Sequence, residues 1–249
     1  MIPQLTPVEQ TALINSLAKQ RLRRFRSATT GDRDAIALYL IDAELAANLH
    51  AGVRFAEVAL RETIHRSLTS QYGERWFQDH RNLLDETADA AFTDAEAAVG
   101  VQAPAGKIIA QVMLGTWVNL LGKGDDKIDG SRAYYVKDLW EPALKHGFSE
   151  PRKDVARLAQ RINWARNRIS HCEPVVFGLP MPGLGAAGIQ VRRSPALIFA
   201  DVQALLQFTT SNFATWLDRW ETTHTLCTHV LVTKALDHIA EDETIQLEQ

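Results

Sequence analysis

The chain has 249 residues, of which 46% are hydrophobic and 23% charged, and its formal net charge at pH 7 is −3. This balance is typical of a globular protein with a sizeable core, and it excludes a disordered chain and a globally basic nucleic-acid binder. The two cysteines, Cys172 and Cys227, fit no disulfide framework, so we expect a protein of the reducing cytoplasm.

The N-terminal segment predicts a helix from about Pro7 to Ala28, because Thr6 and Glu9 form a capping box with proline at the first helical position. Glu9 precedes the basic residues and no long apolar run follows, which is the wrong order for a secretory signal. The far end of this helix is basic. It is either a solvated helix end or a patch that contacts phosphate, and it carries Lys19, Arg21, Arg23, Arg24 and Arg26.

A second helical pattern opens at Gly31-Asp32 and ends at Gly73, with Gly52 as either a tolerated defect or a kink. Four-residue steps place Glu57, Arg61 and His65 on one stripe of it. One interpretation is a Glu57–Arg61 pair within the helix and an ordinary histidine. The other is that Glu57 and Arg61 support the polar motif described below.

The middle of the chain predicts core aromatics followed by three more helices. Trp76 and Phe77 are expected to fill the core, and the helices cover residues 85–99, 107–121 and about 136–145. The second of these contains the most apolar stretch, but it is shorter than the ~20 residues that a membrane span needs. We therefore expect no membrane partner. Glycine-bearing loops are predicted over residues 100–106 and 122–126, and Ser149 is the expected cap of the next helix, with Pro151 near its start.

That next helix carries the most informative motif, Arg166-Asn167-Arg168-Ile169-Ser170-His171-Cys172-Glu173-Pro174. Proline cannot continue a helix, so His171 is expected in or just past the last turn. Asn167 lies one turn earlier on the same face, and the stem of Arg166 is long enough to curl toward it. The motif therefore predicts an imidazole, an amide and a guanidinium within reach of one phosphate.

The rest of the chain changes character after this motif. Four glycines and two prolines over residues 175–194 exclude a continuous helix and predict a flap or a short hairpin, to which Arg192 and Arg193 would give phosphate affinity. Amphipathic helices follow over residues 195–220 and about 222–240, and the acidic tail 241–249 is expected to fray. Since no strand alternation is convincing, we predict one all-α domain over residues 1–249, an antiparallel helical bundle with appended helices.

Four ordered segments of the chain resemble the Abi-like (abortive infection) branch of the HEPN superfamily of RNA-cleaving domains. The motif above is similar to the R-x4-H signature of that superfamily. Earlier matches are the segments at residues 55–65, 106–121 and 139–142. The sequence departs from the Abi-like pattern where Cys172 replaces a frequent second histidine and Glu62 replaces a usual asparagine.

This resemblance implies an HEPN-like helical bundle and a metal-independent endoribonuclease without a cofactor. It further implies a homodimer that leaves 2′,3′-cyclic phosphate ends, acting on cellular or phage RNA as a toxin or abortive-infection effector. An antitoxin or a phage trigger would control it. The residues that match are Arg166, Asn167 and His171 as the catalytic set, with Arg61, Glu57, Arg168 and Glu173 in support.

Elementary chemistry is compatible with these roles. An imidazole exchanges protons near neutral pH, a guanidinium stabilises a phosphorane, and an amide orients either of them. Three alternatives stay open. The motif could be a structural helix end that binds carbonyls, the chain could be a non-catalytic RNA-binding or protein-interaction module, and His224, Cys227 and His229 could bind zinc, although no fourth ligand pairs with them.

Overall fold

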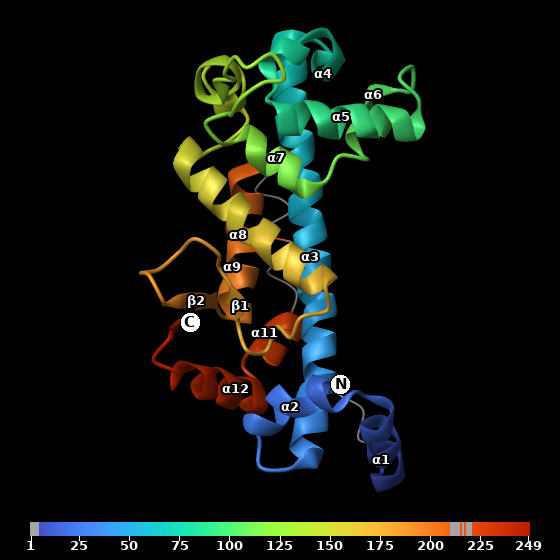
Figure 1. Ribbon diagram of the computed structural model, residues 1–249, viewed down its shortest axis with the longest axis vertical. Coiled ribbons are helices and arrows are strands. Elements are labelled where there is room, and N and C mark those ends of the chain that lie inside the picture. Colours follow the sequence, from blue (N-terminus) through green and yellow to red (C-terminus); the bar gives the residue numbers. More distant parts are fainter. Residues whose placement is uncertain (1–4, 210–214, 216, 218–220) are drawn as a thin grey trace. The chain divides into compact units, whose positions relative to one another are not determined.

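The computed structural model describes residues 5–209, 215, 217 and 221–249, and this part of the chain is mostly helical (Figure 1). The fold is divided into two compact units. Unit 1 comprises Met1–Val53, Trp164–Ala200 and Asp218–Gln249, and unit 2 comprises Arg54–Asn163 and Asp201–Leu217. Three long helices contribute to both units, so each unit is described by itself.

The helices and strands follow in chain order. They are α1 (Pro7–Ser16), α2 (Lys19–Ser27), α3 (Asp32–Tyr72), α4 (Trp76–Asp79), η1 (Arg81–Leu83), α5 (Glu86–Val99), α6 (Ala105–Ile109), α7 (Leu114–Leu120), η2 (Val136–Trp140), η3 (Leu144–His146), α8 (Arg152–Ser170), β1 (Leu179–Pro180), β2 (Gln190–Arg193), α9 (Pro195–Thr209), α11 (Glu221–Cys227), α12 (Val230–Ala240) and β3 (Ile245–Glu248).

The predicted capping box is present, because the Thr6 hydroxyl accepts from the Glu9 N–H and the Glu9 carboxylate accepts from the Thr6 N–H. The single helix over residues 7–28 is wrong, since Leu17 and Ala18 are extended and separate α1 from α2. Helix α1 buries no residue, whereas α2 buries Leu22 and Phe25. Of these two helices, α2 therefore packs against the core and α1 does not.

Helix α3 runs unbroken through Gly52 and ends before Gly73, which has a φ of +91°. In unit 1 it buries one stripe of apolar residues: Ala35, Leu38, Ile41, Leu45 and Leu49. By length and mean hydropathy α3 could cross a membrane, although 44% of its most apolar window is buried in the protein. A buried core helix meets the same criterion, so this feature carries little weight.

Unit 1 also contains a small sheet with strand order β1-β2-β3. Of the two alternatives predicted for residues 175–194, a flap or a short hairpin, the structure contains the hairpin, since β1 pairs antiparallel with β2. The tail does not fray, because β3 pairs in parallel with β2 and Glu248 binds Arg193 at 2.6 Å. Arg192 is buried and donates to the carbonyls of Phe177 and Gly178. The prediction that these two arginines bind phosphate is therefore wrong.

The core of unit 2 is built on aromatic residues, as expected for Trp76 and Phe77, both fully buried. The Phe77 ring stacks on Phe92 of α5 at 5.2 Å, and Phe92 meets Trp117 of α7 edge-on at 5.8 Å. The expected single helix over residues 107–121 is wrong, because α6 ends at Ile109 and α7 begins at Leu114. The Trp117 indole donates to the Val112 carbonyl at 3.1 Å, which a continuous helix would use for a backbone bond.

Two other predictions for unit 2 hold only in part. Residues 136–145 form short π and 3₁₀ turns, η2 and η3, in place of one helix. Helix α8 begins at Arg152, so Pro151 and not Ser149 holds the N-cap position, and the N–H groups of Asp154 and Val155 donate to the Pro151 carbonyl. Helix α9 is described to Thr209, and the predicted stretch at 210–214, 216 and 218–220 lies outside the described residues.

Candidate functional site at the end of helix α8

The end of α8 is a Schellman cap, and this cap decides where His171 lies. The Glu173 N–H donates to the Arg168 carbonyl at 3.0 Å, and the Cys172 N–H donates to the Ile169 carbonyl at 2.9 Å. Cys172 occupies the left-handed position with a φ of +54°, where glycine is usual. His171 is the C-cap residue, just past the last turn as predicted, and the helix ends at Ser170, four residues before Pro174.

The cap is anchored in the core of unit 1 by buried apolar residues that precede and follow it in the chain. Ala165 and Ile169 of α8 are buried, and so are Val175, Val176 and Phe177 of the segment that follows. The turn that carries the polar motif is therefore anchored at both ends.

A buried carboxylate that sequence reasoning did not single out completes this anchor. Oδ1 of Asp42 on α3 accepts from the N–H groups of Val175 at 2.6 Å and Val176 at 3.0 Å. Asp42 is 8% exposed, and burial raises the pKa of its carboxyl to about 6, although both hydrogen bonds and Arg21 oppose that shift. The signal in the sequence was an aspartate on an otherwise apolar helical face.

The three residues predicted to act on RNA lie within one turn and its cap. Nη1 of Arg166 lies 3.4 Å from Oδ1 of Asn167, and the backbone N–H of His171 donates to the Asn167 carbonyl at 3.0 Å. The His171 side chain is exposed, whereas Arg166 and Asn167 are half-buried. Within the described residues, no ion pair or hydrogen bond occupies the His171 imidazole. The imidazole is therefore open to a ligand.

Arginines from other elements concentrate positive charge around this helix end. Nη2 of Arg21 on α2 donates to the Cys172 carbonyl at 2.8 Å, which caps the helix. The guanidinium of Arg24 lies 4.6 Å from the centre of the Phe177 ring, and burial lowers its pKa. Burial, with the charges of Arg24 and Arg168, lowers the pKa of Arg192 to about 10. Arg21 and Arg24 of α2 therefore lie at this helix end with structural contacts, and phosphate binding by the basic end of α2 stays a prediction.

The supporting residues divide between the two units. Arg168 and Glu173 form an ion pair at 2.8 Å directly across the cap, with both side chains more than a third exposed. In unit 2, Arg61 pairs with its neighbour Glu62 at 3.0 Å, not with Glu57 as the intrahelical interpretation had it. Since Glu57 and Arg61 belong to the other unit, their place beside the motif stays a prediction.

The residues considered for zinc do not assemble. His229 caps α12 by accepting from the Leu231 N–H at 3.2 Å, and burial raises the pKa of the Cys227 thiol to about 11. A high thiol pKa disfavours the thiolate that binds metal. Among the described residues no three His, Cys, Asp or Glu side chains are grouped to hold an ion.

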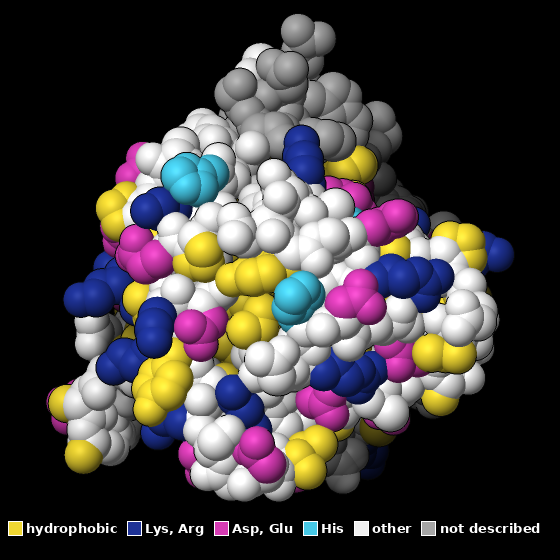
Figure 2. Space-filling model, turned by 90° about the horizontal axis from the view of Figure 1, so that it is seen from above, with side chains coloured by type: hydrophobic (Ala, Val, Ile, Leu, Met, Phe, Trp, Pro, Cys, Tyr) yellow, Lys and Arg dark blue, Asp and Glu magenta, His cyan; other side chains and the backbone are white. Residues whose placement is uncertain are grey.

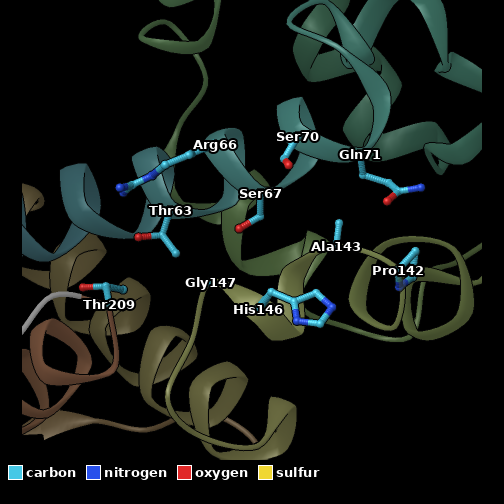
Figure 3. A pocket seen from close by; sticks show the side chains of 10 residues that line it. All are labelled: Thr63, Arg66, Ser67, Ser70, Gln71, Pro142, Ala143, His146, Gly147 and Thr209. Carbon is cyan, nitrogen blue, oxygen red and sulfur yellow. The ribbon is translucent and has the colours of Figure 1, made fainter.

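A polar cavity of about 580 Å³ lies within unit 2, apart from this motif. Polar side chains of α3 form one wall of it and His146 extends from the facing segment, as Figure 3 shows. Gly147 faces α3 closely, since a Cβ there would lie 2.4 Å from Oγ of Ser67. On the face drawn in Figure 2, basic and acidic side chains are interspersed. This matches the low net charge and leaves any RNA contact to local patches.

Fold and site together define a mostly helical protein with a guanidinium, an amide and an imidazole at the capped end of one helix. Comparison of the chain with protein-family models, curated proteins and solved structures gives no match. The resemblance to Abi-like proteins of the HEPN superfamily therefore rests on the sequence motifs alone.

Proposed function

We propose that the protein is a metal-independent endoribonuclease of HEPN type, with Arg166, Asn167 and His171 as its catalytic set. One observation carries this proposal: the Schellman cap leaves the His171 imidazole exposed and unoccupied one turn beyond the Arg166–Asn167 contact. A phosphate at this helix end would meet a fixed cation, an amide and a group that transfers protons near neutral pH.

The reaction that these groups support is transesterification at a ribose phosphate. His171 removes the proton of the 2′-hydroxyl, and the 2′-oxygen attacks the phosphorus while the bond to the 5′-oxygen breaks. The leaving oxygen takes a proton from an imidazolium, and the products are a 2′,3′-cyclic phosphate and a 5′-hydroxyl. Arg166 stabilises the charge on the phosphorane. No water or metal ion enters this step.

One imidazole is thin for the whole acid–base cycle, so we propose a homodimer in which two motifs share one cleft. Cys172 stands where Abi-like proteins often have a second histidine. Its backbone adopts the left-handed conformation of the helix cap. A partner copy would supply the acid that the chain lacks. Arg168 and Glu173 would steady the cap around the substrate. A supporting role for Arg61 and Glu57, which belong to unit 2, stays a prediction from the resemblance.

The cellular role proposed is that of a cytoplasmic toxin or abortive-infection effector cleaving cellular or phage RNA, controlled by an antitoxin or a phage trigger. The second candidate is a non-catalytic RNA-binding or protein-interaction module. The observation that favours it is that Cys172, and not a second histidine, follows His171, so the motif offers one imidazole for an acid–base cycle that needs two proton transfers.

A cleavage assay in EDTA separates these functions. Purified wild-type protein and the His171→Ala variant are incubated with total RNA, and the ends of the fragments are determined. His50→Ala is the matched control, because His50 is exposed on α3 and belongs to no motif. We expect cleavage by the wild type and the control, and loss by a factor of about 10²–10⁴ in His171→Ala. Equal RNA integrity with every protein, both in EDTA and in a parallel incubation without it, refutes the enzyme. Cleavage that occurs without EDTA and is lost in EDTA refutes the metal-free mechanism.

A further inference from the structure

Unit 2 contains a groove of about 540 Å³ that is more basic than the chain as a whole. Its lining residues include four cations and one carboxylate: Lys123, Arg132, Lys137, Arg152 and Glu141. That carboxylate already accepts from the Lys145 ammonium at 3.3 Å. In a chain whose formal net charge is −3, this groove is a local excess of positive charge.

The cations of the groove are of two kinds. The guanidinium of Arg152 donates to the carbonyls of Leu121 at 2.8 Å and Gly122 at 3.2 Å, and that of Arg132 donates to the Gly124 carbonyl at 3.4 Å. The two contacts hold the Arg152 guanidinium in place, whereas Arg132 is exposed and makes one long contact. A carbonyl carries no net charge, and no carboxylate pairs with either arginine among the described residues. The ammonium groups of Lys123 and Lys137 are exposed and have no partner among the described residues.

An aromatic side chain stands among these charges, and the fold holds it there. Tyr135 is fully buried; its hydroxyl accepts from the Asp85 N–H at 2.9 Å, and its own N–H donates to the Lys123 carbonyl at 3.2 Å. Its neighbour Tyr134 lines the groove and is 54% exposed. Anchoring one tyrosine thus presents the next as an open ring on a rigid support.

We propose that this groove binds an unpaired segment of RNA, with Tyr134 stacked on a base and the four cations on the phosphates. Basic grooves with an aromatic platform bind single-stranded nucleic acid in this way, because every base has a face to stack and every phosphate a charge. A duplex keeps its bases stacked on one another, and an acidic peptide offers charge without a flat ring. The choice of RNA as ligand rests on the proposed function, whereas the groove lies in the unit that does not carry the motif.

Binding is measured on the full-length His171→Ala protein, so that cleavage does not enter the result. A labelled unpaired oligoribonucleotide is titrated by fluorescence anisotropy at several salt concentrations. Tyr134→Ala is expected to weaken binding about tenfold, while Tyr134→Phe, which keeps the ring, retains it. The pair Lys123→Gln and Lys137→Gln is expected to lower the slope of log affinity against log salt by about 1.4, or about 0.7 for each phosphate that a lysine no longer neutralises.

The matched control removes the same charge elsewhere in unit 2. Lys107 and Lys153 are exposed and do not line the groove, so Lys107→Gln with Lys153→Gln should leave affinity and slope close to those of the parent. Equal losses in control and groove variants, or an unchanged Tyr134→Ala, overturn the proposal. So does duplex RNA or poly-glutamate that competes as well as the unpaired strand. Cleavage by the wild type is measured in a separate assay. The RNA-binding role of the groove can therefore be refuted without refuting the proposed nuclease activity, and the nuclease activity can be refuted without refuting RNA binding.

Discussion

Asp42 gives the sharpest test of how the helix end is held, because two buried N–H groups depend on one carboxylate oxygen. Val175 and Val176 are fully buried, and both donate to Oδ1 of Asp42. Replacement by alanine leaves both donors without an acceptor, at about 1–3 kcal/mol each. We therefore expect Asp42→Ala to lower the free energy of unfolding by about 2–6 kcal/mol. Asp42→Asn keeps an acceptor oxygen and should keep both bonds.

The ionisation of Asp42 adds a dependence on pH with a definite sign. Burial raises its pKa from 3.8 to about 6, so the folded protein holds this proton to higher pH than the unfolded chain does. The stability that comes from this group is present in acid and is lost as the pH rises from about 4 to 6. Integrated from pH 4 to pH 7, the loss is about 2 kcal/mol. Asp42→Asn cannot ionise, so it should gain that amount relative to the wild type over the same range.

Urea unfolding followed by tryptophan fluorescence at a series of pH values measures both effects. The control is Asp237→Asn, since Asp237 is an exposed aspartate on α12 of the same unit. Its curve should run parallel to that of the wild type. If the wild-type and Asp42→Asn stabilities also stay parallel from pH 4 to pH 7, the carboxyl is not desolvated as argued. If Asp42→Ala is as stable as Asp42→Asn, the two backbone donors do not depend on it.

Three further predictions concern stability. Arg161 binds the buried Asp201 through two hydrogen bonds of 2.8 and 2.6 Å. Arg161→Ala should therefore lower the free energy of unfolding, measured in urea, by about 3–5 kcal/mol. A decrease of less than about 1 kcal/mol would contradict a buried ion pair. Cys172→Gly should stabilise by about 0.5–1 kcal/mol by relieving the left-handed residue, and destabilisation would show that the thiol is needed there. Gly124→Ala should lower the melting temperature by at least about 5 °C, because the added Cβ would clash with the Ala133 carbonyl oxygen. Gly183→Ala is the control and should have a smaller effect. Its φ is also positive, but nothing lies within 4 Å of the added Cβ.

The sequence by itself determined the features that depend on neighbours a turn away. The Thr6–Glu9 capping box, the end of α3 before Gly73 and the position of His171 just past α8 were all predicted from spacing of three to five residues. The glycines and prolines of residues 175–194 likewise allowed a hairpin, since they exclude a helix. Helical period and turn chemistry are local properties, so a sequence displays them directly.

The tertiary structure alone decided which polar groups form hydrogen bonds within the fold and which stay free to bind a ligand. The sequence predicted that Arg192 binds phosphate, but its guanidinium donates to the carbonyls of Phe177 and Gly178. The sequence also predicted a frayed tail, but β3 pairs with β2. Asp42 reaches its two donors across more than 130 residues of chain. Such contacts are set by how distant segments pack, and the demand that every buried donor finds an acceptor is met only in three dimensions.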